Sequence, residues 1–253
     1  MRFSANLGFL WADRPLPDAI HAAKEAGFDA VECHWPYAYD VADIKRALED
    51  TGLAMLGLNT RRGDVGAGDN GLCALPNRRY EARAAISEAL DFARATSTQA
   101  IHVMSGFDKG NAAHDCFVDN LRHAARAAAA DGITVLIEPL NRYDAPEYFL
   151  ATTTQACAIN DEVAEPNLKL MFDCYHVQLM EGDLTHRLNE LLPRIGHIQF
   201  ASAPDRGAPD HGEINFAHIF AHIESLGWHR PLGAEYKHKG PTEATLGWLK
   251  TFG

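Results

Sequence analysis

The chain has 253 residues, of which 47% are hydrophobic and 23% are charged, a composition that excludes a fibrous or disordered protein and allows a sizeable core. The 23 lysine and arginine residues are outnumbered by 34 aspartate and glutamate residues, which gives a formal net charge of -11. No run of basic residues is dense enough to follow a phosphate backbone, so nucleic acid is not expected to be a partner.

Short apolar runs alternate with longer segments of helical spacing along the whole chain. The strand-like runs begin near Phe3, Ala30, Ala54, Ala100, Thr134, Leu168, Ile195 and Pro231. Between them, apolar side chains recur three and four residues apart, as in the sets Leu16, Ile20 and Ala23, then Val41, Ile44 and Leu48, and later Phe216, Ile219, Phe220 and Ile223. Pro15 and Gly27 flank the first of these predicted helices, where a helix start and a helix end favour them.

Eight strand and helix units in a chain of this length predict an α/β fold, a single (β/α)8 TIM barrel that spans residues 1–253 as one domain. The alternative is a doubly wound open sheet, which in a dinucleotide-binding protein would carry a G-x-G-x-x-G turn after the first strand. Residues 6–10, NLGFL, contain no such turn, so the barrel is favoured. The longest loop, from Arg61 to Asn77, is expected to be a lid or a binding loop.

The five cysteines form no C-x-x-C pair, which favours a reducing compartment over a disulfide framework. The N-terminal residues contain no long apolar stretch, and no segment approaches the roughly 18 apolar residues of a membrane span. We therefore expect a cytoplasmic protein with no membrane partner. The sequence leaves open whether it forms a homo-oligomer.

Polar side chains close four successive strands of the predicted barrel. They are Glu138, Asp173, Gln199 and Glu235, each at the point where the loops of a barrel converge. One such residue alone is more often a salt-bridge partner or a loop cap, but four in successive units indicate a shared site. Three carboxylates at one mouth would repel one another unless a cation lay between them. The all-oxygen set predicts one hard divalent metal ion, Mn²⁺ or Mg²⁺.

These residues lie in motifs that resemble the hydroxypyruvate isomerase family of xylose-isomerase-like barrels. The resemblance covers nearly the whole chain and rests on RFSAN at 2–6, IEPLN at 137–141, FDCYH at 172–176, EG at 181–182, GHIQ at 196–199, RG at 206–207, GEIN at 212–215 and EYK at 235–237. It implies that Glu138, Asp173, Gln199 and Glu235 hold the metal ion. It also implies that the two glutamates are the catalytic acid and base, and that His176 and Arg206 contact substrate oxygens.

The reaction implied by the resemblance is an aldose-ketose type isomerisation of a small hydroxy-oxo acid, either hydroxypyruvate to tartronate semialdehyde or a four-carbon 2-oxo acid analogue. A proton must leave the carbon beside a carbonyl group, and we expect Glu138 and Glu235 to transfer it through an enediolate. Arg206 is the best candidate to bind a substrate carboxylate, because a guanidinium can form two parallel hydrogen bonds with it. Lys237 would point to the same side as Glu235 if the strand continued there.

Two other activities use related barrels. A ketose 3-epimerase would share the metal and the enediolate but return the proton to the same carbon, and such relatives usually carry His where this chain has Gln199. A metal-dependent phosphodiesterase or endonuclease would need several metal ions and a His-rich mouth. His34 and His102 lie near strand ends, but the acidic balance argues against this reading. Arg61 and Arg62 follow the third strand, where relatives tend to have more neutral residues, so the identity of the substrate stays open.

Overall fold

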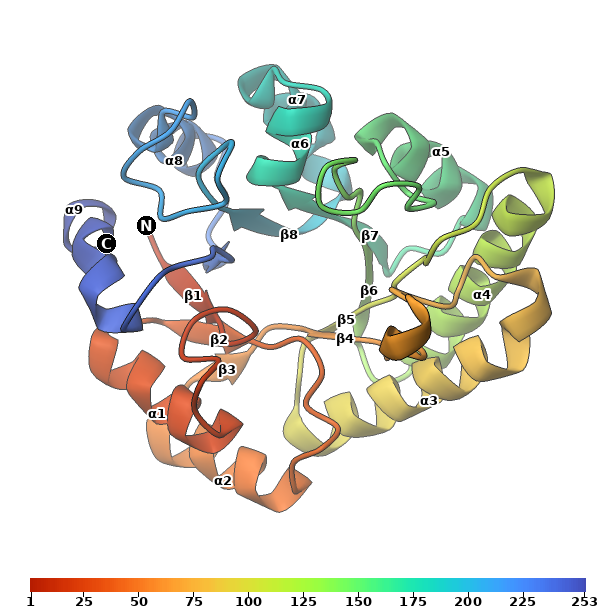
Figure 1. The fold of residues 1–253 in the computed structure, drawn as a ribbon, viewed down its shortest axis with the longest axis horizontal. Coiled ribbons are helices and arrows are strands. Elements are labelled where there is room, and N and C mark those ends of the chain that lie inside the picture. Colours follow the sequence, from red (N-terminus) through yellow and green to blue (C-terminus); the bar gives the residue numbers. More distant parts are fainter.

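The computed structural model describes residues 1–253 as a ring of parallel strands enclosed by an outer layer of helices (Figure 1). The strands are β1 Phe3–Asn6, β2 Ala30–Glu32, β3 Ala54–Met55, β4 Leu58–Asn59, β5 Ala100–His102, β6 Thr134–Ile137, β7 Leu168–Asp173, β8 Ile195–Phe200 and β9 Leu232–Ala234. The α-helices are α1 Leu16–Ala26, α2 Val41–Thr51, α3 Arg79–Thr96, α4 Asn111–Ala129, α5 Thr153–Val163, α6 Cys174–Met180, α7 Leu184–Leu191, α8 Phe216–Ser225 and α9 Leu249–Phe252. Short 3₁₀ helices are η1 Val65–Ala67, η2 Pro76–Arg78, η3 Leu192–Arg194 and η4 Thr242–Trp248.

The sheet runs in the order β3-β2-β1-β9-β8-β7-β6-β5-β4, and all its pairs are parallel. Its two end strands, β3 and β4, are consecutive in the chain and form one barrel strand that is interrupted between them. The interrupted strand bonds to both neighbours, through Leu56 N to Val31 O at 2.8 Å on one side and Gln99 N to Met55 O at 3.1 Å on the other. The sheet therefore closes, which confirms the predicted (β/α)8 barrel and excludes the open sheet.

The helix boundaries follow the local sequence signals. Pro15 precedes α1, and Gly27 ends it in the left-handed conformation with φ of 93°, which costs glycine less than other residues. The Asp40 side chain caps α2 by accepting a hydrogen bond from Ala42 N at 2.8 Å. None of the helices has the length and apolar character that a membrane crossing needs.

The long loop from Arg61 to Asn77 carries η1 and the start of η2 and packs across the residues that follow β5. Gly71 forms an antiparallel bridge with Ser105, and a Cβ atom on Gly71 would lie 2.6 Å from Gly106 N. This close backbone contact requires glycine and ties the loop to the rim of the barrel. Its role as a lid or a binding loop stays a prediction.

The main core cluster contains 70 buried residues, and a separate small cluster contains Ala100, Leu136 and Met171. The largest aromatic group of the main cluster surrounds Phe200 on β8. The Phe200 ring centroid lies 5.7 Å from that of Phe3, 4.9 Å from that of Phe220 and 5.4 Å from that of Trp248, all in edge-to-face geometry. Such pairs add about 0.5–1.5 kcal/mol each beyond the burial of their area. This group joins β1 and β8 to the helices α8 and η4.

Replacing Phe200 with alanine is expected to lower the free energy of unfolding by about 3–5 kcal/mol, because the buried ring would leave a cavity. Denaturant titration, followed by circular dichroism and tryptophan fluorescence, measures this loss. The two probes will report the same transition if residues 1–253 form one domain. Tyr80→Ala is the control, since that side chain is 93% exposed. A loss as large in the control, or none in Phe200→Ala, would contradict this account of the core.

Candidate active site

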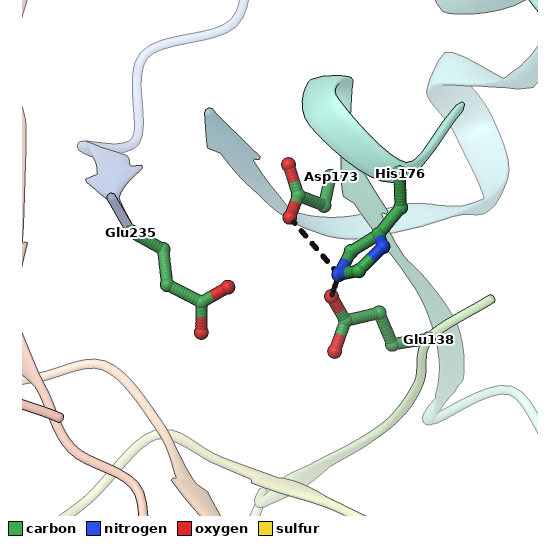
Figure 2. A group of neighbouring side chains, drawn as sticks. All are labelled: Glu138, Asp173, His176 and Glu235. Atoms are coloured by element: carbon green, nitrogen blue, oxygen red, sulfur yellow. Dashed lines mark ion pairs between the residues drawn. The ribbon is translucent and has the colours of Figure 1, made fainter. Parts of the chain in front are cut away.

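Four acidic or histidine side chains meet where the strands β6, β7 and β9 end. Glu138 directly follows β6, Asp173 is the last residue of β7, and Glu235 directly follows β9. His176 comes from the first turns of α6, and Figure 2 shows the four side chains pointing toward one another. Each offers one ligand atom, and these atoms all lie within 4.8 Å of one another. The four side chains are buried, so the charges of the three carboxyl groups interact strongly.

Several oxygen atoms at this site have no partner in the protein. Glu138 Oε1, Asp173 Oδ2 and Gln199 Oε1 are buried and make no hydrogen bond. Gln199 lies next to Asp173 in the pairing of β7 with β8. Buried polar atoms are costly unless a ligand or solvent satisfies them. Carboxylate and amide oxygens suit a hard divalent cation, so these residues fit Mn²⁺ or Mg²⁺.

The hydrogen bonds of His176 determine what its ring can do. Its Nδ1 accepts hydrogen bonds from Asn141 N at 2.9 Å and from Asn141 Nδ2 at 2.7 Å. The proton of the neutral ring therefore sits on Nε2, which lies 3.6 Å from Asp173 Oδ2 and 3.8 Å from Glu138 Oε1. Burial lowers the pKa of His176 to about 3, and the charge of Arg206 contributes. His176 is thus a neutral donor aimed into the site, a role that suits a substrate contact better than a metal ligand.

The Glu235 carboxylate is held by three polar side chains. Arg206 Nη2 donates to Oε2 at 2.5 Å, while His34 Nε2 and Asn6 Nδ2 lie 2.9 Å and 3.0 Å from Oε1. Burial acts to raise the pKa of Glu235, but the charge of Arg206 and the hydrogen bond with His34 outweigh it and hold the pKa below its ordinary value. Glu235 is therefore ionised.

Glu138 lies in a different environment from Glu235. Burial raises its pKa well above the ordinary value, and the charges of Glu235 and Asp173 raise it further. Burial also raises the pKa of Asp173 to about 7, with a further contribution from Glu235. His102 Nδ1 lies 3.6 Å from Glu138 Oε2, but burial lowers the pKa of His102 to about 3 and keeps this ring neutral. The charge of Arg206 acts in the opposite direction but does not outweigh these effects, so the pKa of Glu138 stays raised.

Arg206 lies inside the site, and Lys237 lies at its rim. The Arg206 side chain is 12% exposed, and its guanidinium carbon is 4.9 Å and 5.1 Å from the ring centroids of Phe9 and Tyr175. The Lys237 side chain is 56% exposed, and its Nζ lies 3.8 Å from Asp144 Oδ1. Strand β9 ends before Glu235, so the strand alternation assumed for Lys237 does not hold there. The structure does not bring Lys237 into the buried group.

Further residues at the mouth were not assigned to the site by the sequence analysis. Asn6, Glu32 and His102 are the last residues of β1, β2 and β5, and all three are buried. The signal that selected Glu138 and Asp173, a polar residue at the end of a barrel strand, would also have selected them. Phe9 contacts the site through Arg206 and His34, but an aromatic residue in a loop carries no comparable signal.

Comparison with known sequences identifies relatives over the full length. The model of the xylose isomerase-like TIM barrel family matches residues 20–252. The 2-oxo-tetronate isomerase of Cupriavidus necator is 41% identical over 255 residues, which cover 99% of this chain and 98% of the relative. The hydroxypyruvate isomerase of Escherichia coli is 37% identical over 257 residues, which cover 100% of this chain and 99% of the relative.

Solved structures show the same architecture. A crystal structure from Brucella melitensis, described as AP endonuclease, family 2, has a TM-score of 0.95 and 37% identity, and the match covers 99% of this chain and 98% of that one. D-psicose 3-epimerase from Clostridium cellulolyticum H10 has a TM-score of 0.78 at 18% identity, over 97% of this chain and 89% of that one, a likeness of fold alone. The full-length identities and the barrel together show that the chain belongs to the hydroxypyruvate isomerase family of xylose-isomerase-like barrels.

Proposed function

We propose that this protein is a metal-dependent isomerase that interconverts a small hydroxy-oxo acid and its aldehyde isomer. Hydroxypyruvate and a four-carbon 2-oxo acid are the proposed substrates, because relatives of similar length are named for such acids. The observation that carries the proposal is the buried cluster of Glu138, Asp173, His176 and Glu235 at the mouth of the barrel. It combines carboxylates for a metal ion, two glutamates for proton transfer and a neutral donor.

Glu138, Asp173, Gln199 and Glu235 would hold one Mn²⁺ or Mg²⁺ ion. All four side chains are buried, and Glu138, Asp173 and Gln199 each have an oxygen atom without a hydrogen-bond partner, which supports this proposal. When bound, the ion would stabilise the negative charge that develops on the carbonyl and hydroxyl oxygens of the substrate. Asp173 and Gln199 serve only as ligands in this scheme.

Glu138 and Glu235 face each other across the site and transfer the proton (Figure 2). One carboxylate takes a proton from the hydroxyl-bearing carbon beside the carbonyl group, and a carboxyl group returns a proton to the former carbonyl carbon. The proton of the hydroxyl oxygen passes to the former carbonyl oxygen, so that the carbonyl and hydroxyl groups exchange places. Without the ion, the pKa of Glu138 is raised and that of Glu235 is lowered, so the two carboxyl groups differ before a metal ion binds. His176 Nε2–H donates to a substrate oxygen. These roles account for each member of the cluster.

Arg206 is the proposed partner of the substrate carboxylate. Two of its nitrogen atoms already pair with Glu235 and Asp144, but its buried Nε has no hydrogen-bond partner. That N–H is a donor that a bound carboxylate would satisfy. Lys237, at the rim, would add positive charge along the approach of an anionic substrate.

The related activities are weaker candidates. A 3-epimerase would return the proton to the same carbon, and two epimerases of similar structure share only the fold, at 18% and 17% identity. The endonuclease description belongs to the Brucella melitensis protein, and the mouth of this chain carries three carboxylates that would repel a nucleic acid backbone unless metal ions covered them. Measurement of products and of bound metal separates these activities.

Glu138→Gln and Glu235→Gln are each expected to lower turnover by about 10²- to 10⁴-fold, because either change removes a group that transfers the proton. The assay follows hydroxypyruvate, a four-carbon 2-oxo acid and a ketopentose by NMR in D₂O, with the Mn²⁺-loaded protein. Glu49→Gln, an exposed change on α2, is the matched control and should keep wild-type turnover. Isomerisation of an acid that survives in either site variant would contradict the two-glutamate scheme. Inversion at C3 of the ketose would instead identify an epimerase.

The metal-free protein is expected to bind one Mn²⁺ ion per chain and to unfold at a higher temperature with it, because an ion that binds only the folded state stabilises that state. Calorimetric titration gives the stoichiometry and the affinity. Asp173→Asn should weaken binding by more than about 100-fold, since residues that merely support metal ligands contribute 10- to 100-fold. Asp50→Asn, at an exposed position, should bind as wild type does. Several ions per chain would point toward the nuclease activity.

A further inference from the structure

A fourth carboxylate is buried beside the proposed metal ligands. Glu32 is the last residue of β2 and is 3% exposed. Its side chain accepts hydrogen bonds from four residues, Ser4, Asn6, His197 and Gln199. The proposed reaction assigns no step to Glu32. Its contacts show that it is held firmly and that one of its partners, Gln199, is a proposed metal ligand.

The contact with Glu32 determines which end of the Gln199 amide stays without a partner. Gln199 Nε2 donates to Glu32 Oε1 at 2.8 Å. A carboxylate offers only acceptors, so the amide must present its nitrogen to Glu32. The Gln199 Oε1 atom then faces away from Glu32 and is buried without a partner. If the amide were reversed, Gln199 Oε1 and Glu32 Oε1, both acceptors, would face each other. The free end of the amide would then be its nitrogen, which cannot bind a cation.

The neighbouring strand leaves space for this contact. A Cβ atom on Gly233 of β9 would lie 2.7 Å from Glu32 Oε1 and 2.8 Å from Gln199 Cγ, closer than real Cβ contacts. Glycine at this position therefore allows the two side chains to meet inside the barrel. Asn6 Nδ2 also bonds Glu32 Oε1 and Glu235 Oε1, both at 3.0 Å, which anchors Glu32 from a second direction.

We infer that Glu32 is a positioning residue that orients the Gln199 amide, so that the amide oxygen faces the metal site. The inference rests on the proposed function, because it takes Gln199 to be a metal ligand. Residues that orient a metal ligand typically contribute 10- to 100-fold to metal affinity. Glu32 would supply that contribution without touching the ion or the substrate.

Glu32→Gln tests the inference, because the new amide can offer its own nitrogen to Gln199 and allow the Gln199 amide to turn. Mn²⁺ titration of the metal-free protein, followed by electron paramagnetic resonance, should show affinity weakened by about 10- to 100-fold. Glu32→Asp keeps the charge but withdraws the carboxylate by one methylene, and it should weaken binding as well. Ser4→Ala is the matched control, since Ser4 bonds the same carboxylate but neither Gln199 nor Glu235, and it should bind Mn²⁺ as wild type does.

A double-mutant cycle separates orientation of Gln199 from a general loss of structure. In a Gln199→Ala background, Glu32→Gln should cause no further loss of Mn²⁺ affinity. If Glu32→Gln disturbed the structure in general, its loss of affinity would add to the loss caused by Gln199→Ala. Wild-type affinity in both Glu32 variants, or additive losses in the cycle, would overturn the inference while leaving the metal site in place. If wild-type protein bound no Mn²⁺, or if Asp173→Asn bound it fully, the proposed site would fail and the inference with it.

Discussion

Repulsion among buried carboxylates at the mouth of the barrel is the interaction on which the rest of the site depends. The parallel strands bring Glu138, Asp173 and Glu235 together because their ends converge, whatever the separation of these residues in the chain. Burial raises the pKa of both Glu138 and Asp173, and the charge of Glu235 raises it further. Protons or cations must therefore accompany the cluster. Arg206 is the cationic side chain at the cluster, and its Nη2 lies 2.5 Å from Glu235 Oε2 and 4.0 Å from Asp173 Oδ2.

The two glutamates, which the sequence presents as equivalent, differ because of their neighbours. Glu235 contacts Arg206, His34 and Asn6, and all three stabilise its charge. Glu138 faces His102, a ring that burial keeps neutral. A divalent ion would change this balance, since it would be the largest charge in the site and would favour the ionised form of every ligand. The carboxyl groups would therefore carry fewer protons with such an ion bound than without it.

The same barrel occurs in proteins described as isomerases, epimerases and an endonuclease. A fold therefore does not identify a reaction, and the residues at the strand ends must do so. In this chain the site combines carboxylate and amide oxygens with a neutral histidine donor and an arginine near the Phe9 and Tyr175 rings. Glu32 adds a further constraint, because a carboxylate that only accepts hydrogen bonds controls how a neighbouring amide is oriented.

The barrel and the places of Glu138 and Asp173 could be predicted from the sequence, because strand and helix periods are local and strand ends in a barrel share one mouth. The interruption of the third strand could not be predicted, because both halves read as one apolar run. The contact between Glu32 and Gln199 and the rim position of Lys237 became visible only in the folded chain. Those outcomes depend on strand register, on where β9 ends and on contacts between residues far apart in the chain, none of which a local pattern records.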